Sequence, residues 1–213
     1  MSASTERRIA KALIDAGAVF FVLDAPVTFV SGIWSPVYMD TRRLLAEPEL
    51  WREVIEVLAE AACEEKMAAE IVAGVAVGGI PHSTAVALRA ELPSCFVRKQ
   101  AKEHGRGKAI EGADVEGRRV VLVEDVITTG GSSLDAVTSL REAGAEVVKC
   151  VAIAGYDLDG ASGKFANADV SLHLLAPFPA VLEAAEASGY FPQNAIDEAS
   201  RWHQDPHSWS FSQ

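Results

Sequence analysis

Residues 119–133 have the sequence RVVLVEDVITTGGSS, and this stretch decides which fold we expect. After the arginine come four consecutive apolar residues, three of them valines, a pattern typical of a strand buried on both faces of a parallel sheet. Two acids and a loop of Thr, Gly and Ser follow. Leu134, Val137 and Leu140 then recur at helical spacing, and Gly144 supplies a stop. The order is therefore strand, acidic pair, hydroxyl- and glycine-rich turn, helix.

The turn and the acids have complementary chemical uses. Glycines let backbone N–H groups approach an anion, and the N-terminus of the following helix adds its dipole and unpaired donors. The Glu124–Asp125 pair lies at the carboxyl end of the strand, where open α/β sheets bind ligands, and carboxylates accept hydrogen bonds from sugar hydroxyls. A compound that carries both a phosphate and a sugar therefore fits this combination best. No Lys precedes Ser132, which excludes a Walker loop, and no G-x-G-x-x-G is present; an ordinary strand–turn–helix crossover remains the alternative.

The segment VEDVITTGGS, residues 123–132, resembles the binding motif for phosphoribosyl pyrophosphate (PRPP) in type I phosphoribosyltransferases. In that family the acidic pair holds the ribose hydroxyls and the loop holds the 5'-phosphate. The motif identifies the donor substrate and leaves the acceptor open.

Strands and helices alternate along most of the chain, which predicts an α/β fold with a doubly wound, parallel central sheet of about five strands. Residues 1–45 contain short strand-like runs broken by turns, and we expect them to contribute a small N-terminal hood. The predicted sheet strands are 71–77, 94–98, 120–123, 147–154 and 170–175, and the predicted helices are 4–17, 48–66, 82–91, 178–188 and 193–203. We expect one domain over residues 1–213.

The chain has 213 residues, 49% of them hydrophobic, and a net charge of −11. The negative charge argues against a nucleic-acid or anionic-membrane binder, because both require a positive surface. Three widely spaced cysteines predict free thiols, and no membrane span or signal peptide is evident, so we expect a cytoplasmic protein. The histidines lack metal-ligand spacing and are interpreted as surface or capping residues.

The densest cationic run, RKQAKEHGRGK, covers residues 98–108 and precedes the phosphate motif. Three glycines between positions 105 and 112 predict a mobile loop over residues 99–113. A basic, flexible loop can close over a polyphosphate and exclude water. A solvated charged loop is the alternative, and the position of the run in front of the motif favours the functional interpretation.

Nearly the whole chain resembles the orotate phosphoribosyltransferases. The basic loop followed by Ile110-Glu111-Gly112 is similar to that family's catalytic loop, and Ser31-Gly32-x-x-Ser35-Pro36 to Arg42 resembles its substrate segment. Gly74 to Ile80 resembles its pyrophosphate-side loop. Gly155-Tyr156-Asp157-Leu158 is similar to a branch found in many Gram-positive bacteria.

The resemblance implies a reaction and roles. Ribose 5-phosphate would pass from PRPP to orotate, with Mg²⁺ held mainly by the substrate and no dedicated metal-binding residues. Lys102, His104 and Asp125 would be catalytic, and Thr128 and Arg42 would contact orotate. The loop would reach into the partner's site in a homodimer. The expected PRPP contacts are Arg98, Lys99, Lys102, His104, Glu124, Asp125, Val126, Ile127, Thr128, Thr129, Gly130, Gly131 and Ser132.

Two other functions stay open. Ile33 and Trp34 stand where the family often has a cation, which leaves room for an enzyme that uses another nucleobase. A regulator that keeps the donor site as a PRPP sensor is the second alternative; the intact basic loop argues against it.

Overall fold

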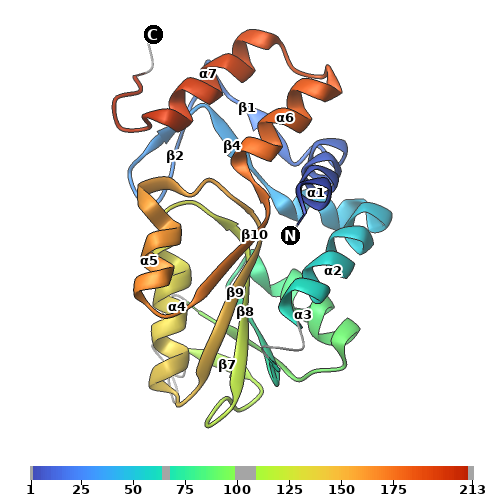
Figure 1. The fold of residues 1–213 in the computed structure, drawn as a ribbon, viewed down its shortest axis with the longest axis vertical. Coiled ribbons are helices and arrows are strands. Elements are labelled where there is room, and N and C mark those ends of the chain that lie inside the picture. Colours follow the sequence, from blue (N-terminus) through green and yellow to red (C-terminus); the bar gives the residue numbers. More distant parts are fainter. Residues whose placement is uncertain (1, 64–67, 99–108, 211–213) are drawn as a thin grey trace.

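A computed structural model describes residues 2–63, 68–98 and 109–210, and its centre is a six-stranded sheet (Figure 1). The strand order is β10-β9-β8-β5-β6-β7. The strands are β5 (Ile71–Val75), β6 (Ser94–Val97), β7 (Ile110–Gly112), β8 (Arg119–Ile127), β9 (Glu146–Gly155) and β10 (Ser171–Pro177). Five of them are parallel, which confirms the predicted α/β class, and β7 pairs antiparallel with β6 at the edge.

Strand β7 corrects one expectation. Residues 110–112 fall within the loop expected to be mobile, 99–113, whereas they pair with β6, Val97 lying opposite Ile110. Gly112, with φ of +115°, packs against Cys95, where a side chain would collide. Of the predicted loop, residues 99–108 lie outside the described residues.

Both faces of the sheet are covered by helices (Figure 1). Val121 and Val123 of β8 belong to one apolar core, and Val120 and Leu122 belong to the other. Burial of each such side chain contributes about 1.5–3 kcal/mol, which explains why an all-apolar run forms the centre of the sheet. On one face lie α1 (Ala3–Asp15), α2 (Pro48–Ala62) and α3 (Gly79–Ala90), and on the other lie α4 (Gly131–Glu142) and α5 (Ala161–Asn167).

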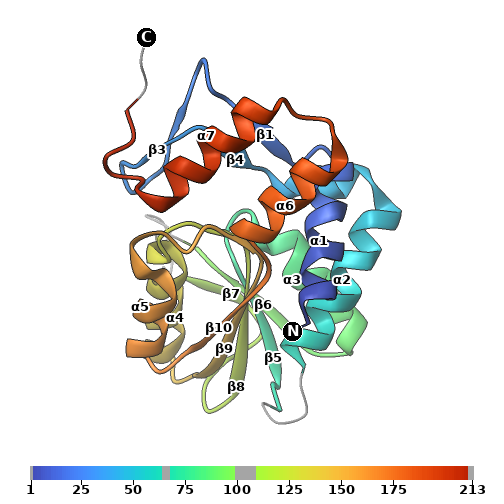
Figure 2. The same cartoon turned by 45° about the horizontal axis from the view of Figure 1, so that its top comes forward.

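A hood lies above the carboxyl ends of the strands (Figures 1 and 2). It contains the antiparallel pairs β1 (Val19–Phe21) with β4 (Val37–Met39) and β2 (Val27–Thr28) with β3 (Trp34–Ser35), followed by the 3-10 helix η1 (Thr41–Ala46). Two C-terminal helices, α6 (Phe178–Ser188) and α7 (Gln193–Gln204), lie beside these strands. By contrast, α1, which falls within residues 1–45, packs against β10 and α6.

An aromatic cluster joins the C-terminal helices to the hood strands. The Trp202 side chain is fully buried and lies edge-on to Tyr156 and Phe178, with ring centroids 5.7 Å away in each case. Its indole Nε1–H donates to the Trp34 carbonyl at 2.7 Å. The hood is therefore built from both ends of the chain.

The order of the strands in the sheet predicts where a binding crevice lies. Among the parallel strands, β5 and β8 are neighbours, but α3 leaves β5 on one face and α4 leaves β8 on the other. A gap opens at such a switch point, at the carboxyl ends of the two strands. β8 extends beyond its apolar run to Ile127, so Glu124 lies within the strand, opposite Ala152, and does not follow it as expected.

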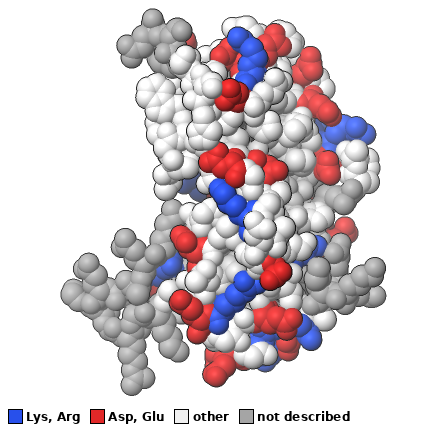
Figure 3. Space-filling view, turned by 60° about the vertical axis from the view of Figure 1, so that its left-hand side comes forward, with Lys and Arg blue, Asp and Glu red and all other residues white. Residues whose placement is uncertain are grey.

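Charged side chains of both signs are interspersed on the face drawn in Figure 3. In the part of the chain that the structure describes, no helix combines the length and apolarity needed to cross a membrane.

Candidate active site

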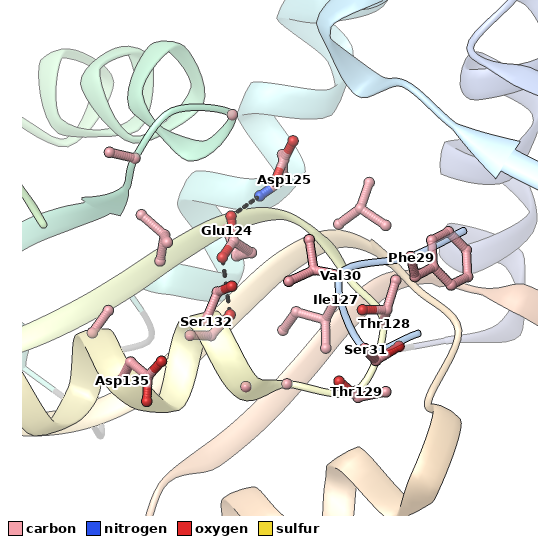
Figure 4. Close-up of a pocket in the computed structure, with 18 of the residues that line it drawn as sticks. Phe29, Val30, Ser31, Glu124, Asp125, Ile127, Thr128, Thr129, Ser132 and Asp135 are labelled. Carbon is pink, nitrogen blue, oxygen red and sulfur yellow. Dashed lines mark hydrogen bonds between the residues drawn. The ribbon is translucent and has the colours of Figure 1, made fainter. Parts of the chain in front are cut away.

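A cavity of about 780 Å³ lies at the β5–β8 switch point, between the sheet and the hood (Figure 4). It brings together the expected acids, the expected phosphate loop and residues from the hood. The principal lining residues are Phe29, Val30, Ser31, Tyr38, Met39, Val75, Ala76, Val77, Gly78, Arg98, Glu124, Asp125, Val126, Ile127, Thr128, Thr129, Gly130, Gly131, Ser132, Ser133, Asp135 and Tyr156.

The loop from Thr128 to Gly130 is anchored from behind. Its carbonyls at Thr128 and Thr129 accept hydrogen bonds from Leu158 N (3.0 Å) and Lys164 Nζ (3.3 Å), on the side of α5. Gly130 has φ of +81° and precedes α4, whose first N–H groups have no partners within the helix. The loop and the helix N-terminus together form an anion site beside the cavity.

We expect Gly130→Ala to weaken binding of a phosphorylated substrate. A Cβ there would lie 2.9 Å from the Phe165 ring. The left-handed backbone adds roughly 1–2 kcal/mol of strain. The KM for that substrate should rise about 10-fold if the loop contributes about 1.4 kcal/mol less to binding.

The control is Gly163→Ala, in α5, where no atom lies within 4 Å of the added Cβ. Steady-state kinetics and thermal unfolding of both variants check the prediction. An unchanged KM for the phosphorylated substrate in Gly130→Ala would show that the loop conformation does not matter for binding.

The two carboxylates of the acidic pair point in different directions (Figure 4). Glu124 is 5% exposed; its Oε1 accepts from the Asp125 N–H at 3.1 Å and its Oε2 from the Ser133 hydroxyl at 2.9 Å. Burial, and then the neighbouring Asp125, raise the pKa of Glu124. The Asp125 carboxylate instead lies against Gly78, where a Cβ would come within 1.9 Å of Oδ2. Two separate hydroxyl groups can therefore be accepted at the cavity.

The hood side of the cavity is largely apolar and aromatic, with Phe29, Val30 and Tyr156 on its wall. Tyr156 is buried, its hydroxyl donates to the Val37 carbonyl at 3.2 Å, and its ring centroid lies 5.2 Å from that of Phe29. Burial raises the pKa of Tyr156, so the phenol stays neutral. None of these three residues was expected to line the site. The position of Tyr156 directly after a sheet strand was the available signal.

Of the basic residues expected at the site, one lines the cavity, one lies elsewhere and three lie outside the described residues. Arg98 lines the cavity and forms an ion pair with Glu111, Nη1 to Oε1 at 2.8 Å. Lys99, Lys102 and His104 lie outside the described residues. Arg42 does not line this cavity: its Nε contacts Asp40 Oδ1 at 2.5 Å, beside a second hollow of about 450 Å³. Its role in binding orotate stays a prediction.

His82 contradicts the interpretation of the histidines as surface residues. It is fully buried on α3, and its Nδ1 accepts the Trp51 indole N–H at 3.1 Å. The physical reason is a contact between distant residues. His82 lies near the start of α3, and α2, which carries Trp51, packs over that turn and buries it.

The comparisons with known proteins agree with this geometry. The family described as "Phosphoribosyl transferase domain" matches residues 40–172. An orotate phosphoribosyltransferase from Coxiella burnetii (strain RSA 493 / Nine Mile phase I) is 39% identical over 209 residues, which cover 98% of this chain and 99% of that protein. An orotate phosphoribosyltransferase from Bacillus caldolyticus is 41% identical over 201 residues, 94% of this chain and 97% of that protein.

Among solved structures, the orotate phosphoribosyltransferase from Aeropyrum pernix superposes with a TM-score of 0.70 at 30% identity, covering 85% of this chain and 99% of that one. The domain match spans more than half of the chain, and the relatives match it almost from end to end. With the acidic pair, the phosphate loop and the hood in one cavity, the chain belongs to the orotate phosphoribosyltransferase family of type I phosphoribosyltransferases.

Proposed function

We propose that this cavity transfers ribose 5-phosphate from PRPP to N1 of orotate, giving orotidine 5'-phosphate and pyrophosphate. One observation carries the proposal: the acidic pair and the phosphate loop share a cavity whose third wall is aromatic. A sugar phosphate and a flat base fit such a cavity side by side. The whole chain acts as one domain, with residues 1–45 contributing to the hood.

The donor lies along the ends of β5 and β8. Its 5'-phosphate takes the loop Thr128 to Ser132 and the N-terminus of α4, where dipole and amide groups favour an anion. Its ribose hydroxyls face Glu124 and Asp125. The pyrophosphate then extends towards the end of β5 and Arg98, which line the same cavity.

The reaction breaks the C1–O bond early, so positive charge develops on the ribose ring and negative charge on the departing pyrophosphate. Cations aimed at the leaving group stabilise this charge most when water is excluded. Lys102 and His104 supply them from the loop, Arg98 and Lys99 add further contacts, and Lys102 or His104 delivers a proton to the leaving oxygen. Asp125 positions the sugar.

The donor set fits magnesium. Mg²⁺ prefers oxygen ligands and commonly combines carboxylates with substrate phosphates. Glu124 and Asp125 provide carboxylate oxygens beside the ribose position, while no group of three or more His, Cys, Asp or Glu side chains forms a metal cluster within the described ranges. Bound Mg²⁺ would neutralise charge on the pyrophosphate. We therefore expect activity to be lost on chelation with EDTA.

The active form is a homodimer in which the basic loop between β6 and β7 of each subunit completes the partner's site. This proposal rests on the resemblance of that loop to the family's catalytic loop. The reaction takes place in the cytoplasm, in keeping with three cysteines that form no disulfide in the structure.

Orotate lies against the hood wall, with Thr128 nearby and Phe29 as an apolar face. Trp34, the reason for considering another base, does not line the cavity; its side chain is 51% exposed on β3. Its substitution for a cation therefore leaves the base-facing wall intact.

An absorbance assay with PRPP, Mg²⁺ and one base at a time tests the proposal. Orotate should be consumed, with uracil, adenine and hypoxanthine unchanged. If one of the other bases is consumed in place of orotate, that base is the acceptor and the assignment of orotate is wrong. Tight PRPP binding without consumption of any base would favour the alternative function, a regulator that senses PRPP.

A further inference from the structure

Two buried side-chain polar atoms of the described residues have no hydrogen-bond partner, Thr41 Oγ1 and His82 Nε2. For His82 the tautomer follows from its other nitrogen. Nδ1 accepts the Trp51 indole N–H at 3.1 Å, so it carries no proton, and the neutral ring must carry its proton on Nε2. Burial lowers the pKa of His82 to about 4, which keeps the ring neutral near pH 7. The structure thus contains a buried N–H donor with nothing to bond.

The geometry of α3 directs this donor. Gly78 precedes the helix and His82 lies one turn further on, so both are on one face. Helical side chains lean towards the N-terminus, and the imidazole therefore leans back towards Gly78. The Asp125 carboxylate lies against that same glycine, since a Cβ at Gly78 would be 1.9 Å from Oδ2. The nearby charge of Asp125 raises the pKa of His82, against the larger lowering caused by burial.

We propose that His82 is a positioning residue for the transferase reaction: when substrate is bound, the Asp125 carboxylate accepts the His82 Nε2–H, which Trp51 fixes, and this bond holds the carboxylate towards the ribose hydroxyls. The inference rests on the proposed function. A carboxylate at the end of a short side chain has several rotamers, and a fixed donor selects one of them in the substrate complex. Pairing also removes the cost of a buried, unsatisfied N–H group.

The experiment is a double-mutant cycle. His82→Leu removes the donor, and His82→Gln keeps an N–H donor near the position of Nε2. Each is made in the wild-type protein and in Asp125→Ala, which has no side-chain acceptor. The Kd for PRPP and the Tm are measured for all variants, and kcat and the KM values for PRPP and orotate are measured where Asp125 is present. We expect His82→Leu to raise the KM for PRPP about 10-fold, the low end for a lost hydrogen bond to a charged group, with the KM for orotate little changed.

Rescue and coupling separate positioning from a general structural role. His82→Gln should stay within about 3-fold of wild type, and His82→Leu should have almost no effect on the Kd for PRPP in the Asp125→Ala background. His207→Leu, at an exposed histidine that contacts Asp159, is the matched control. An equal effect of His82→Leu in both backgrounds would overturn the inference.

Trp51→Phe provides a second test if His82→Leu does not fold. It leaves the imidazole but removes the donor that fixes its tautomer, so the KM for PRPP should rise in the same direction by a smaller factor. An unchanged KM would contradict the proposal. Inactivity of the wild-type protein towards orotate would refute the proposed function, whereas an active wild type without coupling would refute only the role of His82.

Discussion

Lys102→Ala is expected to lower kcat by about 10²-fold or more, the range for a group that protonates or stabilises a leaving group. The departing pyrophosphate is a polyanion, and three acidic side chains of the described residues line the cavity, Glu124, Asp125 and Asp135, whose negative charge repels it. The basic loop must therefore supply compensating positive charge. Single-turnover measurements of orotidine 5'-phosphate formation would separate the chemical step from product release.

The control for Lys102→Ala is Lys11→Ala, at an exposed lysine that pairs with Asp15 on α1, remote from the cavity. It should keep wild-type turnover. If purified, folded Lys102→Ala also keeps wild-type turnover, the assignment of the loop is wrong.

Mixing subunits extends this prediction to the shared site. Lys102→Ala and Asp125→Asn are each nearly inactive when alone. If the loop of one subunit completes the partner's cavity, a mixed dimer has one site with both residues intact, and part of the activity returns. Failure to recover activity after subunit exchange, followed by mass spectrometry, would show that each subunit uses its own loop.

Glu124→Gln is expected to abolish most activity while making the substrate-free protein more stable. Its carboxylate accepts ribose hydroxyls, and losing a hydrogen bond to a charged group costs about 1.5–3 kcal/mol, or roughly 10- to 10²-fold in kcat/KM. The same carboxylate is 5% exposed and lies beside Asp125, so its charge opposes folding. The amide keeps the shape and removes the charge.

The sign of the pH dependence follows from the raised pKa of Glu124. The stability associated with this group is fully present below its unfolded value of 4.5 and is lost as pH rises through the higher folded pKa. The Tm advantage of Glu124→Gln should therefore grow from acid to neutral pH, by about 2–4 °C for each kcal/mol. His82 acts equally in both proteins and cancels in the comparison.

Calorimetry across this pH range, with and without PRPP and Mg²⁺, measures both effects of Glu124→Gln. Ligand should raise the Tm of wild type far more than that of the variant. Glu142→Gln, at an exposed glutamate near the end of α4, is the matched control. A Tm of Glu124→Gln below wild type at neutral pH would mean that the buried charge is better compensated than its contacts indicate.

Much of the fold could be predicted because its central signal is local. Four apolar residues before two acids specify a doubly buried strand, and both cores of the structure meet at Val120 to Val123. The glycine turn before α4 was equally predictable, since Gly130 is needed for a left-handed backbone there; its binding of phosphate stays a prediction. These features depend on adjacent residues, which a sequence displays directly.

The features that were missed depend on distant partners. Strand β7 forms because the edge of β6 is available for pairing, whereas the glycines between positions 105 and 112 predicted a loop. Trp202 completes the hood from 168 residues away in sequence, through the Trp34 carbonyl. The buried state of His82 depends on Trp51 and the cover provided by α2. Neither spacing nor composition indicates such pairings.

The bond from Trp202 to the Trp34 carbonyl has a consequence for biosynthesis. While the ribosome is still adding α7, the nascent chain already contains the entire sheet, the phosphate loop and the acidic pair. The base-facing wall, however, lacks the indole that supports it until residue 202 has left the exit tunnel. A growing polypeptide can therefore contain the sheet side of the cavity before the aromatic wall of the hood has its support.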